Sequence, residues 1–197
     1  MAASGWRGVW DRFTGRGTYP HQLAFILLNP LRNLIFSPRE LAERLHLAAN
    51  SRVLELGPGP GFFSVSIARR IPSGHLCLVD LQGEMLEKAR ARIRRAGVTN
   101  VSFAQASATA LPFAREVFDA AFLVAVIGEV PDAAACVAQL RDALRPGGLL
   151  SITELAGDPD AMTESDVAAL AKAANLEPDE TFPMRLGFTI NFRKAQS

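Results

Sequence analysis

Residues 53–61 read Val-Leu-Glu-Leu-Gly-Pro-Gly-Pro-Gly, and this stretch decides the fold. It belongs to a short β-rich run that starts at Arg52 and passes directly into a loop of three glycines and two prolines. Residues 62–71 follow with apolar side chains at helical spacing. A strand, a glycine turn and a helix in direct succession indicate the first unit of a parallel α/β sheet.

The rest of the chain repeats this alternation. Further apolar runs lie at residues 76–79, 101–104, 118–127 and 149–153, with two shorter runs near Phe182 and at 187–192. Helical patterns lie between them at residues 84–96, 133–144 and 164–174. The long runs are almost continuously apolar, as expected for strands covered on both faces. We therefore predict an α/β fold whose doubly wound, mostly parallel sheet has seven strands, with the last two runs forming an antiparallel pair at its edge.

The amino-terminal part has a different character. Residues 1–18 show no periodicity, and Pro20 to Leu28 predicts a short apolar helix. Ser37-Pro38-Arg39-Glu40 is typical of a helix start, with a capping serine, an early proline and a glutamate three residues after the serine. We expect that second helix to end near Asn50. The predicted division is an arm and lid helix over residues 1–38 and one domain over 39–197.

Composition narrows the classes of function. The 197 residues carry a formal net charge of +1, so no global field favours nucleic acid or anionic lipid. Four arginines between Arg90 and Arg95 predict either a solvated helix face or a phosphate-binding stripe. No uninterrupted apolar stretch reaches the ~18 residues of a membrane-spanning helix, and we expect no signal peptide. The sequence leaves the oligomeric state open.

The two cysteines, Cys77 and Cys136, each lie inside an apolar run. This placement predicts buried free thiols, and no spacing of cysteine or histidine suggests a metal site. Such sparse cysteine use fits a reducing compartment, so we expect a cytoplasmic protein without a metal.

In doubly wound sheets, ligands bind beyond the carboxyl ends of the strands, where the strand order reverses. Gly57 and Gly59 carry no Cβ, so a ligand can lie against the backbone there. Gly61 opens the next helix, whose free amide groups can hold a carboxylate. Asp80 closes the second run, where a carboxylate can accept hydrogen bonds from both hydroxyls of an adenosine ribose. A tight turn and a strand-terminal helix cap are the alternatives for these residues.

Nicotinamide cofactors use the same layout and give the main alternative function. Their fingerprint has a third glycine at the position of Phe62, where close packing of helix on strand requires it. Here the loop is GxGxG, and no Tyr-x-x-x-Lys pair is present. A Gly-Lys-Ser/Thr sequence is also lacking, which excludes a nucleotide-triphosphate P-loop.

Four motifs in order resemble class I S-adenosylmethionine-dependent methyltransferases. They are residues 53–61, Val79-Asp80, Leu111-Pro112-Phe113 with Phe118-Asp119, and Leu144 to Gly148. The resemblance runs from about Glu40 to Glu154 and is nearest to the small methyltransferases grouped with the ubiquinone/menaquinone C-methyltransferases. It implies a Rossmann-like fold, S-adenosylmethionine as cofactor and methyl transfer to a small molecule.

The resemblance also implies roles for matching positions. Glu55 would orient the loop and face the methionine amino group, and Asp80 would hold the ribose. Leu81 and Met85 would pack near the adenine. The methionyl part would lie against Gly57, Pro58, Gly59 and Gly61.

Further along the chain, Ala125 and Val126 would line the floor beneath the sulfonium. Ala106-Ser107-Ala108 stands where the family often has Gly-Asp-Ala, with the aspartate reaching the adenine amino group. Ser107 can accept one hydrogen bond there, but it is shorter and uncharged. We therefore place Ser107 and Ala108 beside the adenine, with either the serine or the backbone reading it.

No catalytic residue is readable from the sequence. Methyl transfer from a sulfonium needs mainly positioning of two reactants and exclusion of water. His21, with Tyr19 as a lid residue, and Glu129 after the fourth run are the candidates for a general base and substrate contacts; Glu129 has the alternative of capping the helix after Pro131. The apolar segment 23–36 predicts either a pocket for an apolar or aromatic acceptor or a helix that only completes the core. A protein that binds the cofactor without turnover is the non-enzymatic alternative.

Overall fold

The computed structural model describes residues 36–156 and 159–196, so the predictions for residues 1–35 lie outside it. The strands are β1 (Arg52–Leu56), β2 (His75–Asp80), β3 (Val101–Gln105), β4 (Phe118–Val124), β5 (Leu144–Leu155), β6 (Leu176–Met184) and β7 (Gly187–Lys194). The helices are α3 (Pro38–Arg44), α4 (Ser64–Arg70), α5 (Gly83–Arg95), α6 (Ala133–Ala143) and α7 (Glu164–Ala173), with a 3₁₀ turn η3 (Ile127–Glu129).

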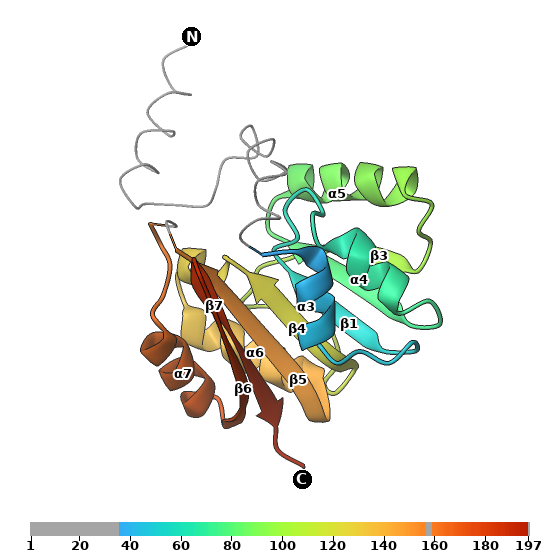
Figure 1. The fold of residues 1–197 in the computed structure, drawn as a ribbon. Helices are drawn as coiled ribbons and strands as arrows, with labels where there is room; N and C mark the ends of the chain where they lie inside the picture. Colours follow the sequence, from blue (N-terminus) through green and yellow to red (C-terminus); the bar gives the residue numbers. More distant parts are fainter. Residues whose placement is uncertain (1–35, 157–158, 197) are drawn as a thin grey trace, which may run out of the picture.

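The strands form one seven-stranded sheet in the order β3-β2-β1-β4-β5-β7-β6, which confirms the predicted fold class (Figure 1). β1 to β5 pair in parallel, whereas β7 pairs antiparallel with both β5 and β6. The antiparallel strand therefore lies one position inside the edge strand β6. The order reverses between β1 and β4, and this switch point is where doubly wound sheets bind ligands.

Two apolar layers cover the sheet. Side chains of α3, α4 and α5 pack on one face against residues such as Val53 and Phe122. Side chains of α6 and α7 pack on the other face against residues such as Leu54 and Ile152. Figure 1 shows these two helix groups on opposite faces. Both faces are covered, which explains why the strands are almost continuously apolar.

The predicted start of α3 is confirmed, but its predicted end is wrong. Ser37 and Glu40 form the reciprocal capping box, with the Ser37 hydroxyl accepting from the Glu40 amide at 3.1 Å. The helix ends at Arg44 rather than near Asn50, because His46 has a left-handed backbone with φ of +48°. Outside the helix, the imidazole of His46 lies 2.6 Å from the Glu180 carboxylate.

Other boundaries also differ from the prediction. The fourth run stops being a strand at Val124, since Ala125 takes a φ of +54°. The helix after the glycine loop begins at Ser64, two residues later than expected. The polar residues 177–181 form most of the edge strand β6, where exposure on both sides removes the apolar signal.

Arg44 anchors α3 to the sheet. Its guanidinium donates to the Thr189 hydroxyl at 2.8 Å and lies over the rings of Phe36 and Phe182, 4.8 and 5.0 Å from their centroids. The Asn191 amide donates to the Arg44 carbonyl oxygen at 2.8 Å. Phe36 is itself buried, so the chain is part of the core from the first described residue.

Candidate functional site

The glycine loop leaves the carboxyl end of β1 at the switch point. The Gly57 amide donates to the Val79 carbonyl oxygen of β2 at 2.8 Å, which ties the loop to the neighbouring strand. Gly57, Gly59 and Gly61 all have positive φ. A Cβ on Gly57 would lie 2.5 Å from a Val126 methyl group, so only glycine fits there. The glycine positions of the loop therefore present backbone without a side chain beside the β4 end.

Asp80 lies at the same end of the sheet as this loop, on the adjacent strand. Burial raises the pKa of its carboxyl, while hydrogen bonds from the backbone of Gln82, Gly59 and Leu81 lower it. The Gln82 amide lies 2.9 Å from Oδ1. The contact with Gly59 joins the carboxylate and the loop into one structure. The juxtaposition expected from their strand positions is therefore present.

Glu55 is the second buried acid of the site. The period-two alternation of a strand places its side chain on the same face as Val53, next to α4. The Ser64 hydroxyl donates to Glu55 Oε2 at 2.6 Å. Burial raises the pKa of Glu55 to about 8; the Ser64 hydrogen bond lowers it, and the charge of Asp80 raises it further. The carboxyl is thus largely protonated at neutral pH and sensitive to any cation placed beside it.

The residues predicted near the adenine surround the end of β2. Leu81 is 59% exposed directly after Asp80, whereas Met85 is buried on α5. The Ala106 amide donates to the Asp80 carbonyl oxygen at 3.1 Å, which brings the following segment to the same edge. Within that segment Ser107 Oγ accepts from the Thr109 amide at 3.3 Å.

Ala108 lies beside this serine and is half-buried against the α6 side of the core. The Ser107 hydroxyl also lies 2.9 Å from that of Thr109. Ser107 thus already stabilises the local turn through both the amide and the hydroxyl of Thr109.

Ala125 and Val126 follow β4 and close the opposite side of the loop. The Ala125 amide donates to the Thr153 carbonyl oxygen at 2.8 Å, and its left-handed backbone turns the chain away from the sheet. That turn presses Val126 against Gly57. The loop predicted to line the methionyl part and the segment predicted to lie beneath the sulfonium are therefore in contact.

Of the residues predicted to take part in catalysis or substrate binding, the structure describes Glu129. Tyr19 and His21 lie outside the described residues. Glu129 lies in η3, half-buried, beyond the end of β4. It does not cap α6, because Asp132 does so by accepting from the Ala135 amide at 2.9 Å.

Sequence reasoning missed two residues at this edge. Ser64 was read only as part of a helix, yet it holds Glu55. Glu154, near the end of β5, is buried on the α6 side, and its Oε2 accepts from the Met162 amide at 3.1 Å. Neither position has a local signal, because each contact depends on where two separate elements meet.

The comparisons with known proteins agree with this geometry. A family model described as a methyltransferase domain matches residues 53–148, from β1 into β5. The chain carries a class I S-adenosylmethionine-dependent methyltransferase domain. Every cofactor-site candidate of this methyltransferase domain, from Glu55 to Val126, lies inside the matched span.

Curated relatives match a little over half of the chain. A ubiquinone/menaquinone biosynthesis C-methyltransferase of Pasteurella multocida is 35% identical over 105 residues, which are 52% of this chain and 39% of that protein. The protein of the same name from a Marinomonas species is 33% identical over 118 residues, 59% of this chain and 47% of that protein. The chain thus spans less than half the length of these two relatives.

Solved structures share the fold over more of the chain. A methyltransferase from Aquifex aeolicus described as SAM dependent aligns with a TM-score of 0.84 at 18% identity, covering 89% of this chain and 99% of that one. The 1,6-didemethyltoxoflavin-N1-methyltransferase of Burkholderia thailandensis aligns with a TM-score of 0.69 at 20% identity, covering 91% and 92%. At these identities the likeness establishes the fold of the methyltransferase domain.

Proposed function

We propose that the protein transfers the methyl group of S-adenosylmethionine to a small apolar or aromatic acceptor. The observation that carries the cofactor part is the contact between Asp80 and the glycine loop at the switch point. A bare backbone bend and a buried carboxylate side by side fit an adenosyl group, because the first admits close approach and the second binds hydroxyls.

Each residue has a defined task in this proposal. Asp80 accepts hydrogen bonds from the ribose, with Leu81 and Ser107 beside the adenine. Glu55 faces the amino group of the methionine part. The loop from Gly57 to Gly61 leaves room for the cofactor backbone.

The cofactor supplies a methyl group that is already activated as a sulfonium. The protein then has to align the acceptor and exclude water, and positioning of this kind contributes ~7–11 kcal/mol. Val126 and Ala125 close the site at the β4 end. A general base at His21 or Glu129 is not required for the alignment itself, and its use depends on the acceptor.

An apolar acceptor is supported by the side chains at the carboxyl edge. Val124, Leu155 and Met184 are the last residues of β4, β5 and β6, and all three are partly buried against the α3–α5 side of the core. The three strands run in the same direction, so these ends share one edge. Glu55 lies on the same face. This row of apolar side chains favours a ring or an alkyl group over a charged acceptor.

The alternative functions are less well supported. In a nicotinamide-binding loop the position of Phe62 would be glycine; here its ring packs edge-on against Phe63, with centroids 4.8 Å apart.

Among the described residues, no helix meets the length and hydropathy needed to cross a membrane. Cys77 and Cys136 are both free and buried, as predicted, which supports a cytoplasmic location as part of this proposal. We propose a small-molecule substrate and no nucleic-acid partner.

Calorimetry with S-adenosylhomocysteine tests the cofactor site. Asp80→Asn removes the charge that accepts from the ribose, and we expect the dissociation constant to rise about tenfold or more. Asp179→Asn, on the edge strand β6, is the matched control and should bind like the unmodified protein. Equal affinity of all three proteins would refute the placement. Stabilisation by NADH but not by S-adenosylhomocysteine would overturn the proposed function.

Turnover is tested separately with a panel of phenols, hydroquinones and amines, by following release of S-adenosylhomocysteine. Methylation of an aromatic or apolar member supports the acceptor class. Methylation of the charged amines alone, with no methylation of a phenol or hydroquinone, would contradict it.

A further inference from the structure

An open groove lies on the surface between α4 and the second half of α5. It has a volume of about 440 Å³, within the range of small-molecule sites. Three arginines line it: Arg69 from α4, and Arg92 and Arg95 from α5. Arg92 and Arg95 are three positions apart, so they share one side of the helix. None of these residues belongs to the proposed cofactor site.

The three guanidinium groups have no carboxylate partner among residues 36–156 and 159–196. Arg69 donates to the Ala96 carbonyl oxygen at 3.1 Å, and the Arg92 guanidinium lies 6.0 Å from the centroid of the Phe62 ring. Arg90, on another side of the same helix, does have a partner, since it lies 3.4 Å from Glu87. Three cations that converge on one hollow repel each other, and a bound anion would offset that repulsion.

The lining also carries a polar and an apolar part. Ser66 adds a hydroxyl, while Phe62 and Val65 contribute apolar surface. Guanidinium groups bind phosphate through paired hydrogen bonds, and three of them suit a dianion better than a single carboxylate. The apolar side chains suit an organic group attached to that phosphate.

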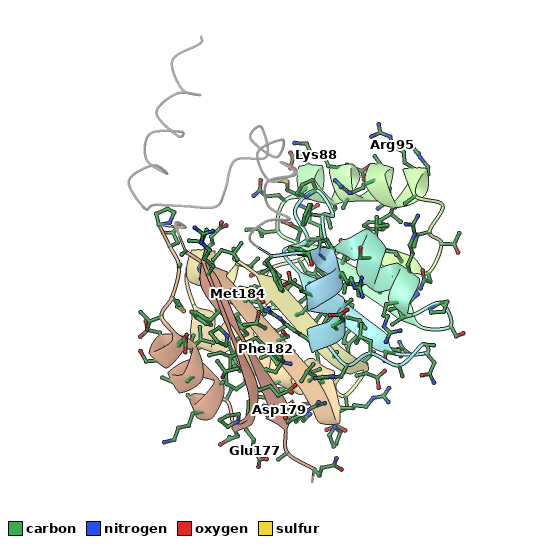
Figure 2. All side chains as sticks on the ribbon, in the orientation of Figure 1. Lys88, Arg95, Glu177, Asp179, Phe182 and Met184 are labelled. Carbon is green, nitrogen blue, oxygen red and sulfur yellow. The ribbon has the colours of Figure 1, made fainter. Side chains whose placement is uncertain are left out.

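We propose that this groove binds an organic phosphate monoester, with the phosphate held by Arg69, Arg92 and Arg95 and the organic part against Phe62 and Val65. The same chemistry occurs in a free phosphate ester and in the headgroup of phosphatidic acid. Figure 2 labels Lys88 and Arg95 on α5, with Arg95 its last residue and Lys88 near its middle, so positive charge continues along that helix beyond the groove. The proposal is independent of the methyl acceptor.

Titration with 1-naphthyl phosphate tests the site, by its fluorescence or by calorimetry. The double variant Arg92→Gln, Arg95→Gln should weaken binding about tenfold or more, because each charge-assisted bond to phosphate contributes strongly. The control Arg70→Gln, Arg94→Gln removes the same charge from exposed positions that do not line the groove. It should change the dissociation constant less than about twofold, since neither side chain lines the groove and salt screens the more distant charges. Thermal melts of both variants check that the fold is unchanged.

Two further arms separate the sources of the phosphate. The first experiment measures cosedimentation of the protein with phosphatidic acid vesicles, with phosphatidylcholine vesicles as the control. If the vesicles capture the unmodified protein and the control variant but not the groove variant, the ligand is the lipid headgroup. Binding of the soluble ester with no vesicle capture assigns a free ligand. The proposal would be overturned if both double variants lost binding equally, or if S-adenosylhomocysteine competed with the ester. It would also be overturned if 1-naphthol bound as tightly as its phosphate, or if the groove bound an RNA oligonucleotide and none of the phosphates.

Discussion

Replacing Glu55 with glutamine should change how the stability of the cofactor-free protein depends on pH. Burial raises the pKa of Glu55 to about 8 in the folded protein, from an ordinary value of 4.5. Below about pH 4.5 the carboxyl is protonated in both states. Between pH 4.5 and 8 the unfolded chain loses this proton while the folded protein keeps it, so the free energy of unfolding falls as pH rises. Above pH 8 this contribution is gone.

The size of the effect follows from the same two values. The difference between the two pKa values, 4.5 and about 8, corresponds to roughly 5 kcal/mol at about 1.4 kcal/mol for each pH unit. Glutamine has the shape of the protonated acid, can accept from Ser64 and does not ionise. Relative to the unmodified protein, Glu55→Gln should therefore gain stability steadily from pH 5 to pH 8, by roughly 3–4 kcal/mol of this total.

Urea denaturation at pH 5, 6, 7 and 8 measures this difference directly. Ser64→Ala provides a second variant with an opposite expectation: it removes the hydrogen bond that lowers the Glu55 pKa, so the loss of stability should extend to higher pH. A free-energy difference between Glu55→Gln and the unmodified protein that stays constant from pH 5 to pH 8 would show that burial does not keep this carboxyl protonated.

Three other outcomes can be measured with the same preparations. Binding of S-adenosylhomocysteine at pH 7 should release nearly one proton, because an ammonium beside Glu55 favours its ionised form; a calorimetric enthalpy that is identical in buffers of different ionisation enthalpy would contradict this. Gly57→Ala should abolish cofactor binding, since its Cβ would lie 2.5 Å from a Val126 methyl group, and adding Val126→Ala should restore only part of it because the strained φ costs roughly 1–3 kcal/mol; full recovery would mean that steric overlap alone matters. Arg44→Met should lower the free energy of unfolding by roughly 1–3 kcal/mol, since it loses the hydrogen bond to Thr189 and both ring contacts, whereas Arg39→Met on the exposed side of α3 should change it little.

The sheet and the cofactor edge could be predicted because their signals are local. The glycine loop follows β1 directly, and Asp80 ends β2, so the parallel topology alone brings them to one edge. The capping box at Ser37 was readable for the same reason, since both partners lie within four residues.

What could not be predicted depends on contacts between separate elements. Ala125 has a left-handed backbone, but alanine gives no sequence signal for it as glycine would. The fourth run was therefore predicted to continue to Ile127. Only the end of β6, near Phe182, was predicted, because the edge position leaves exposed polar residues over 177–181. Ser64 and Glu55 lie nine residues apart on a helix and a strand, so no local pattern indicates their contact.

The hydrogen bond from the Gly59 backbone to Asp80 has a consequence for the speed of ligand capture. The entropy of arranging the bend and the acid has already been lost during folding, so an arriving nucleoside has little left to organise. Its association should then be limited by diffusion and orientation, and differences in affinity among analogues should arise in their dissociation rates.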